Sequence, residues 1–276
     1  MELSRPAIDV VSRLLNQRTG QQFESNRHWR MASALAAPLR QRGIASSEML
    51  IHRLSQDKVL AQDVVEALLN NETYFFRDGA VFEHIATRVL PGLVQRRQDQ
   101  RSLAIWSAGC STGQEALSLA MLVAEQRHRL AGWSIDILGT DVSAAAIAAA
   151  RRGVFTQFEI QRGLGVGRML ASFESRADGW HAADWLKQMV RFEMQNLLDG
   201  PPAVERFDLI LCRNVLLYFD QATRQRAFAN LARALAPGGL LVLGGGETIL
   251  GQTDRLVADR DNPGFYRHVP DLCRTG

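Results

Sequence analysis

The chain has 276 residues, of which 46% are hydrophobic, and a formal net charge of +3. This length exceeds the roughly 100–200 residues of one domain, so we expect a large domain with a small accessory domain. No apolar run reaches the roughly 18–20 residues of a membrane helix. The first ten residues, MELSRPAIDV, also lack the charged-then-apolar plan of a signal peptide. We therefore expect a soluble, cytoplasmic protein with no direct membrane insertion.

Charge and cysteine usage exclude further classes. Lysine and arginine form no block with interleaved aromatic residues, so nothing indicates a nucleic-acid surface. Cys110, Cys212 and Cys273 are few and widely spaced, which argues against a disulfide framework and against a zinc site. We expect no metal. Cys110 and Cys212 follow predicted strands, and a redox role for them is the less favoured alternative to small buried side chains.

Residues from about 5 to 70 have the 3–4 spacing of helices. The apolar stripes are Ile8, Val11, Leu14 and Leu15, then Met31, Leu35 and Leu39, then Leu60, Val64, Val65, Leu68 and Leu69. A polar and aromatic junction, NETYFFRD, covers residues 71–78. An amphipathic helix over residues 79–97 follows, with Asp78 as its expected N-cap. We predict an all-helical domain and linker over residues 1–77, and a second domain over 78–276.

From Ser102 onward strands and helices alternate. Strands are predicted at LAIWSAG (103–109), before Asp141, and at MVRFEMQN (189–196), FDLILCRN (207–214) and GLLVLGGGE (239–247). Helices are predicted from near Gly113, over 144–152 and over 221–235. Repeated strand–helix–strand units predict an α/β fold with a parallel sheet and helices on both faces. The glycine-containing stretch 153–188 interrupts the rhythm, and we expect a small insertion with short strands there.

A nucleotide-type cofactor site is indicated at the carboxyl ends of these strands. The loop in WSAGCSTGQE (106–115) contains Gly109 and Gly113, where the backbone can approach a ligand, although such glycines as often serve tight packing. Asp141 ends the second strand and could accept both ribose hydroxyls; alternatively it caps the next helix. Asn196 could contact an adenine edge, or be a turn residue.

The segment after the fourth strand, RNVLLYF (213–219), lacks the Asn/Asp-Pro-Pro-aromatic pattern of enzymes that methylate exocyclic nitrogens. A carboxylate nucleophile is already ionised near pH 7, so it needs alignment and loss of water rather than a base. Arg77 could grip such a carboxylate, or be a surface ion pair. Tyr218 could donate to it or line a methyl channel, or be a core aromatic residue.

Several motifs together resemble the chemotaxis receptor glutamate methyltransferases, the CheR family. They are NETYFFRD, IWSAGCSTGQE, LGTDVS, FEMQNLL, FDLILCRNVLLYFD and LAPGGLLVLGGGE, in the family's order over about residues 70–247. The resemblance implies a Rossmann-like S-adenosylmethionine methyltransferase sheet, a small N-terminal helical domain and a small β-subdomain over 153–188. It implies transfer of methyl to glutamate carboxylates, giving methyl esters and S-adenosylhomocysteine, on the cytoplasmic signalling domain of a methyl-accepting chemotaxis-type receptor.

The resemblance also implies roles for single residues. Asn71, Thr73 and Arg77 would line the cofactor and substrate site. Glu115 would bind the methionine amino end of the cofactor, Asp141 the ribose, and Asn196 with Leu197 the adenine. Asn214 with Val215 would contact the methionine portion, and Arg77 and Tyr218 would flank the methyl group. The chain departs from the family's Gly-Glu-Glu-Pro-Tyr-Ser, with Gln114, Ala116 and Leu117 in that motif, but it retains Glu115.

Three questions stay open from the sequence. The β-subdomain could add a receptor tail peptide as an extra strand. Arg27, His28, Arg30, Arg40 and Arg42 could meet an acidic receptor surface, or form a solvated basic face. The alternative functions are a regulator that binds the cofactor without catalysis, and a methyltransferase acting on another carboxylate substrate or on nucleic acid.

Overall fold

A computed structural model describes residues 3–23 and 28–270, excluding the side chain of His28. Contacts between residues divide the chain into two compact units. The first is Met1–Asn70 with Tyr218–Arg224, and the second is Asn71–Leu217 with Gln225–Gly276. Among the described residues, no helix combines the length and the apolar character needed to cross a membrane. The predicted domain boundary between residues 77 and 78 stays a prediction.

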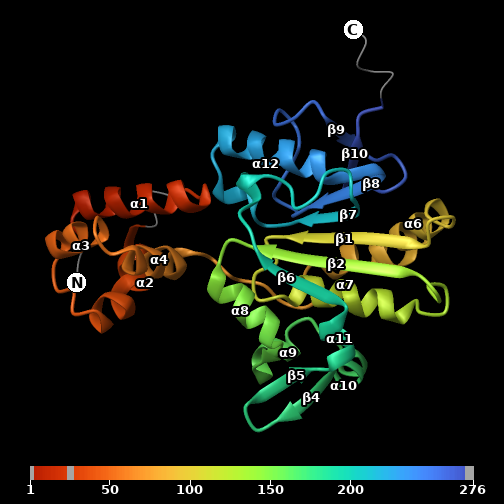
Figure 1. Cartoon of the computed structure of the whole chain (residues 1–276), viewed down its shortest axis with the longest axis horizontal. Helices are drawn as coiled ribbons and strands as arrows, with labels where there is room; N and C mark the ends of the chain where they lie inside the picture. Colours follow the sequence, from red (N-terminus) through yellow and green to blue (C-terminus); the bar gives the residue numbers. More distant parts are fainter. Residues whose placement is uncertain (1–2, 24–27, 271–276) are drawn as a thin grey trace. The chain divides into compact units, whose positions relative to one another are not determined.

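Among the described residues up to Asn70, the first unit contains four helices (Figure 1). They are α1 (Arg5–Thr19), α2 (His28–Gln41), α3 (Ser47–Leu54) and α4 (Lys58–Leu68). The three predicted apolar stripes are confirmed on α1, α2 and α4, and they supply most of this unit's core. The short helix α3 was not predicted. It begins where the Ser46 hydroxyl accepts a hydrogen bond from the amide of Met49.

The helix predicted over 79–97 has an irregular middle. It consists of α5 (Gly79–His84), a π-helical turn (Ile85–Val89) and α6 (Leu90–Arg96). Pro91 lies in the first turn of α6 and has no N–H to donate, which interrupts the regular ladder next to the π turn. Asp78 occupies the N-cap position of α5, as predicted, but its φ is 59° and its side chain makes no capping hydrogen bond.

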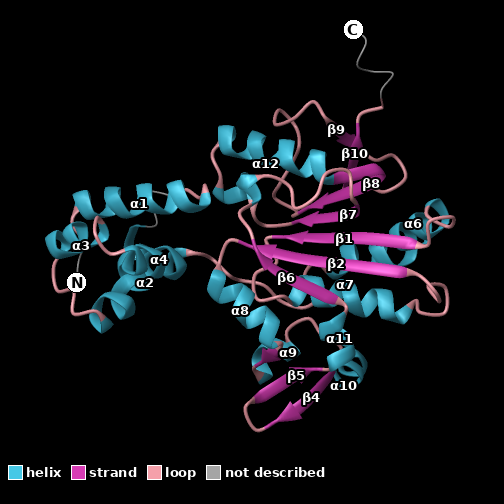
Figure 2. Ribbon diagram, viewed as in Figure 1, coloured by secondary structure: helices cyan, strands magenta, loops and turns pink. Residues whose placement is uncertain are grey.

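The second unit contains a seven-stranded sheet in the order β6-β2-β1-β7-β8-β10-β9. The strands are β1 (Ser102–Ala108), β2 (Ser134–Asp141), β6 (Val190–Met194), β7 (Phe207–Cys212), β8 (Leu235–Leu243), β9 (Leu256–Ala258) and β10 (Phe265–His268). The first five in the sheet order are mutually parallel, and β10 is antiparallel to both neighbours. Figure 2 shows β1, β2 and β7 pointing to one edge. The predicted α/β, Rossmann-like class is confirmed, although β9 and β10 were not predicted.

The helices that position the site are α7 (Gln114–Glu125), α8 (Ala144–Arg152) and α12 (Gln221–Ala234). The helix α7 contacts β1 and β2, while α8 contacts β2 and β6. The strand order reverses between β1 and β7, because β2 and β6 are added on one side of β1 and β7 and β8 on the other. Parallel sheets leave a crevice for ligands outside the carboxyl ends of the strands at such a reversal.

The stretch between α8 and β6 forms a separate antiparallel sheet. Its strands are β3 (Val154–Phe155), β4 (Phe173–Arg176) and β5 (Gly179–Ala182), in the order β3-β5-β4. Three short helices accompany it: α9 (Gln157–Gln161), α10 (Val166–Ser172) and α11 (Asp184–Gln188). The Thr156 side chain caps α9 through a complete capping box with Glu159.

Phe75, from the NETYFFRD segment, joins this small sheet to the rest of the second unit. Its ring is fully buried and lies edge-on to Phe155 and Phe173, with centroids 5.1 and 5.3 Å away. A side chain on Gly163 would overlap the Phe75 carbonyl oxygen, so glycine is required at this approach. The segment is therefore anchored by aromatic packing on one side.

We predict that Phe75→Ala lowers the free energy of unfolding by about 3–5 kcal/mol, because it removes a buried ring and leaves a cavity. Urea unfolding followed by tryptophan fluorescence measures the loss. Phe158→Ala is the control: that side chain is 73% exposed, and its removal should change stability by no more than about 0.5 kcal/mol. Equal losses in the two variants would contradict the anchoring role of Phe75.

Candidate active site

Three segments of the second unit meet at the carboxyl edge of its sheet: residues 71–78, the loop 109–113 after β1, and the turn 213–216 after β7. Six non-glycine residues of the described chain have a positive φ, and four of them lie in these segments. The four are Phe76, Asp78, Ser111 and Asn214. Such backbone persists only where surrounding contacts enforce it, and it concentrates at functional sites.

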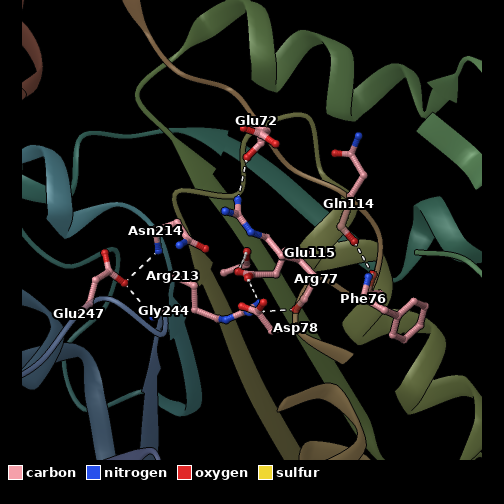
Figure 3. Close-up of polar contacts among 12 residues, drawn as sticks. Glu72, Phe76, Arg77, Asp78, Gln114, Glu115, Arg213, Asn214, Gly244 and Glu247 are labelled. Atoms are coloured by element: carbon pink, nitrogen blue, oxygen red, sulfur yellow. Dashed lines mark hydrogen bonds and ion pairs between the residues drawn. The ribbon is translucent and has the colours of Figure 1, made fainter. Parts of the chain in front are cut away.

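The Arg213 guanidinium joins the turn after β7 to the segment 71–78 and to the start of α7 (Figure 3). Its side chain is 1% exposed. One amino group, Nη1, lies 3.0 Å from Oε2 of Glu115, and Nη2 donates to the carboxylate of Asp78 and, at 2.9 Å, to the carbonyl oxygen of Arg77. The side chain of Asp78 is therefore engaged with Arg213 instead of capping a helix.

Glu115 lies in the first turn of α7 and accepts from two sides. The Ser107 hydroxyl donates to its Oε1 at 2.8 Å, and Arg213 holds its Oε2. Burial raises the pKa of Glu115 above its usual value, while the Arg213 cation and the Ser107 hydrogen bond oppose that rise. The result is a desolvated carboxylate in a fixed orientation.

Asp141, at the end of β2, accepts backbone N–H groups on both carboxylate oxygens. Ser111 N lies 2.8 Å from Oδ2, and Ser143 N lies 2.9 Å from Oδ1. The helix α8 is instead capped by the Ser143 hydroxyl, which accepts from Ala146 N at 3.0 Å. The alternative that Asp141 caps α8 is therefore wrong, and Asp141 orients the loop after β1.

The loop after β1 touches both other segments. The Ser111 hydroxyl donates to the carbonyl oxygen of Asn71 at 2.8 Å. Gly109 has a φ of 78°, and a side chain there would overlap the Cγ2 methyl of Val215. The absence of a side chain at Gly109 thus makes room for Val215, and the two loops pack tightly at this point. Gly113, also at positive φ, stands at the start of α7.

Arg77 and Tyr74 lie on the NETYFFRD segment. The Nη1 of Arg77 donates to the Glu72 carbonyl oxygen at 3.1 Å, and its guanidinium lies 5.6 Å from the centre of the Tyr74 ring. Arg162 lies 4.3 Å from the same ring and pairs with Glu72 at 2.8 Å. Arg77 makes no salt bridge to a described carboxylate. The alternative that Arg77 forms a surface ion pair is therefore not seen among the described residues.

Thr73 is half-buried in this segment, between Asn71 and Arg77. Asn196 and Leu197 follow β6. The Asn196 side-chain oxygen accepts from Leu198 N at 2.9 Å and caps a 3₁₀ turn (Leu197–Asp199). Leu197 is buried, and its carbonyl oxygen accepts from the Asn230 amide at 2.8 Å. Asn196 therefore has a turn-forming role.

Tyr218 belongs to the first unit, where it ends a 3₁₀ turn (Leu216–Tyr218). Its hydroxyl oxygen accepts from the Asn70 side-chain amide at 2.7 Å, and its carbonyl oxygen accepts from Gln22 N at 2.8 Å. The Tyr218 hydroxyl therefore has a partner, but the side chain is only half-buried, so Tyr218 is not the core aromatic residue of the alternative.

The site residues fit an aminoacyl-nucleoside cofactor. The Oδ1 of Asn214 is buried and has no hydrogen-bond partner among the described residues. An acceptor of this kind is expected to be satisfied by a ligand or by water. Glu115 and Asp141 supply carboxylates, which suit an ammonium group and vicinal hydroxyls respectively.

Two buried cysteines adjoin the site. Burial raises the pKa of Cys110 and Cys212 well above the usual thiol range, and nearby carboxylates raise it further. Both side chains are therefore protonated and poorly nucleophilic near neutral pH, which disfavours the redox alternative. Cys273 lies outside the described residues.

Comparison with known proteins places the chain in a family. The family model for the CheR methyltransferase S-adenosylmethionine-binding domain matches residues 71–260. The chain belongs to the CheR methyltransferase family. This match covers the junction, the small sheet and every strand of the large sheet except β10, so the predicted CheR resemblance is confirmed.

Curated CheR-family relatives match over almost the whole chain. A chemotaxis protein methyltransferase of Vibrio parahaemolyticus is 34% identical over 259 residues, covering 92% of this chain and 93% of the relative. Chemotaxis protein methyltransferase 1 of Pseudomonas aeruginosa is 34% identical over 273 residues, covering 97% and 99%. Chemotaxis protein methyltransferase 1 of Vibrio cholerae is 37% identical over 204 residues, covering 73% of each chain.

Sequence reasoning missed how the CheR motifs are held together. Arg213, Asp78, Ser107 and Ser111 make the bonds described above, and none was a predicted site residue. One signal was available for Arg213: it is a charged residue directly after the six apolar or buried residues of β7. Such a residue needs a partner close to the strand end.

We predict that Arg213→Met lowers the free energy of unfolding by about 3–5 kcal/mol, because it leaves Glu115 buried without its cation. Urea denaturation measures the change. Asp78→Asn is the matched control, since the Asp78 side chain is 48% exposed and its pairing should contribute at most about 1 kcal/mol. A loss for Asp78→Asn as large as that for Arg213→Met would contradict the central role of the buried pair.

Proposed function

We propose that this chain transfers the methyl group of S-adenosylmethionine to glutamate side chains of a chemotaxis-type receptor, giving glutamate methyl esters and S-adenosylhomocysteine. The observation that carries the proposal is that Arg213, in the turn after β7, joins NETYFFRD to Glu115 on α7, while Ser111 in the loop after β1 bonds to Asn71, all within the match to the CheR family. The relatives' names, chemotaxis protein methyltransferases, support the receptor as substrate class.

The proposed cofactor contacts follow the carboxyl edge of the sheet. Glu115 would bind the methionine ammonium group and Asp141 the ribose hydroxyls. The remaining contacts would come from Asn71, Thr73, Arg77, Gly109, Asn196, Leu197, Asn214 and Val215. The buried, unpartnered Oδ1 of Asn214 supports a polar contact on the methionine side. The side-chain amide of Asn196, at the end of β6, is of the chemical type that reads an adenine edge.

The chemistry asks for alignment. S-adenosylmethionine supplies an electrophilic methyl group, and a glutamate carboxylate attacks it without prior loss of a proton. Arg77 is the proposed catalytic residue that holds the substrate carboxylate by its guanidinium. Its bond to the Glu72 carbonyl oxygen and its place beside Tyr74 restrict the orientation of the side chain. Tyr218 is the second proposed catalytic residue, donating to the carboxylate or lining the methyl path.

The proposed partner is the cytoplasmic signalling domain of a methyl-accepting receptor, whose substrate region is acidic. Arg30 and Arg40 are exposed on α2 and are available to such a surface. Arg42 instead forms ion pairs with Asp57 and Asp63 inside the first unit. Arg27 and the side chain of His28 lie outside the described residues.

We predict that membranes containing the receptors take up labelled methyl from S-adenosylmethionine as base-labile ester, released as volatile methanol. Arg77→Ala should lower this activity by about 100-fold or more, because the nucleophile loses its alignment. Arg88→Ala, an exposed arginine of the π-helical turn, is the matched control and should retain wild-type activity. If wild-type protein binds the cofactor by calorimetry but forms no ester on any protein, the regulator alternative replaces this proposal.

We also predict that the dissociation constant for S-adenosylmethionine rises as the pH falls from neutral toward the raised pKa of Glu115, because the carboxylate takes up a proton as that pKa is approached. Burial raises the pKa of Glu115, and only its ionised form pairs with the ligand's ammonium group. Calorimetry in buffers of different ionisation enthalpy measures the accompanying proton release. Glu115→Gln should bind more weakly and lose this pH dependence; an unchanged dependence would contradict the assignment.

A further inference from the structure

The Glu247 carboxylate receives four backbone N–H groups from two loops. Its Oε1 accepts from Val215 N at 2.9 Å and from Leu216 N at 2.7 Å. Its Oε2 accepts from Asn214 N at 2.9 Å and from Gly244 N at 2.7 Å. Figure 3 shows Glu247 beside Asn214 and Gly244. One side chain thus joins the turn after β7 to the loop after β8.

The turn after β7 has the form of an anion-binding nest. Three successive N–H groups converge on one carboxylate, and the first of these residues, Asn214, has a φ of 60°. Successive backbone N–H groups in such a conformation form a concavity for an anion. Here the anion belongs to the chain itself, and its charge-assisted hydrogen bonds stabilise an unfavourable backbone conformation.

The two loops are in direct contact around this carboxylate. A side chain on Gly244 would come within 2.8 Å of both Asn214 N and the Oε2 of Glu247. No larger residue fits at this position without moving the turn. Glu247 and Gly244 therefore determine together where the turn lies relative to the end of β8.

The turn after β7 also makes three contacts within the candidate site. Arg213, its first residue, holds Glu115 and the Arg77 carbonyl oxygen. Asn214 presents its buried, unpartnered Oδ1. Val215 fills the space above Gly109 in the loop after β1. A displacement of the turn would disturb all three contacts at once.

We propose that Glu247 is a positioning residue for the cofactor site. Its carboxylate holds residues 214–216 in the conformation that places Asn214 and Val215 against the methionine portion of S-adenosylmethionine. Glu247 acts through the backbone of the turn and does not touch the reacting atoms. The assignment rests on the proposed function only in taking this turn as a wall of the cofactor site.

The test uses Glu247→Gln and Glu247→Ala in the full chain. The glutamine variant keeps a carbonyl oxygen for one pair of N–H groups but turns an NH₂ group toward the other pair. Calorimetry with S-adenosylmethionine gives the dissociation constant and the number of sites, and the receptor assay gives kcat and KM. We expect the dissociation constant to rise about tenfold or more with close to one site per folded chain, and kcat/KM to fall roughly 10–100-fold, as for small misplacements in active sites.

Asp208→Asn is the matched control. This buried carboxylate at the amino end of β7 accepts from Ala104 N at 2.9 Å and pairs with Arg97, at the opposite edge of the sheet. Its loss should lower the melting temperature and leave the dissociation constant unchanged. Wild-type affinity and kcat in both Glu247 variants, whatever their melting temperatures, would overturn the proposal. If the alanine variant does not fold, the dissociation constant and kcat of the glutamine variant alone test the proposal. Absence of methyl transfer by the wild-type protein would instead contradict the proposed function.

Discussion

The candidate site depends on one desolvated cation. Arg213 is almost fully buried and lies between Glu115 on α7 and Asp78 on the junction segment. Removing a guanidinium from water is costly, and only a close and well-oriented set of acceptors offsets that cost. The junction segment and the start of α7, which supply those acceptors, must therefore fold against the turn that carries Arg213 before its two amino groups are paired. This requirement makes the site a single cooperative arrangement, although Arg213 lies 98 residues from Glu115 and 135 from Asp78 in the sequence.

The same segments contain most of the unfavourable backbone conformations of the described chain. Asp78, Ser111 and Asn214 each have positive φ, and each makes a hydrogen bond across the site: Asp78 to Arg213, Ser111 to Asp141 and Asn214 to Glu247. Methylation of a carboxylate needs no proton transfer before attack, so geometry is the main demand on the enzyme. A site held by fixed hydrogen bonds to rigid strand ends suits that demand.

Periodicity and strand–helix alternation were sufficient to predict the helical region, the α/β class and five strands of the large sheet. The motifs were sufficient to predict the CheR family. Side-chain partners were not predictable in the same way. Asp78 stands where a helix cap is expected, but the buried Arg213 competes for its carboxylate. The strands β9 and β10 are short, and β10 pairs antiparallel with both β8 and β9, so the strand–helix alternation gave no sign of them.

The small sheet is inserted in the chain between β2 and β6, and the sequence alone suggests an insertion that could be deleted or replaced. The ring of Phe75 rules out such an excision, because it lies between Phe155 and Phe173 while its neighbours along the chain line the candidate site. Gly163 lies directly against the Phe75 carbonyl oxygen. A chain without the insertion would leave this ring in water and release one side of the junction. Natural variation and protein engineering can therefore change the outer strands of the small sheet, but they must retain aromatic side chains at Phe155 and Phe173, which pack against Phe75.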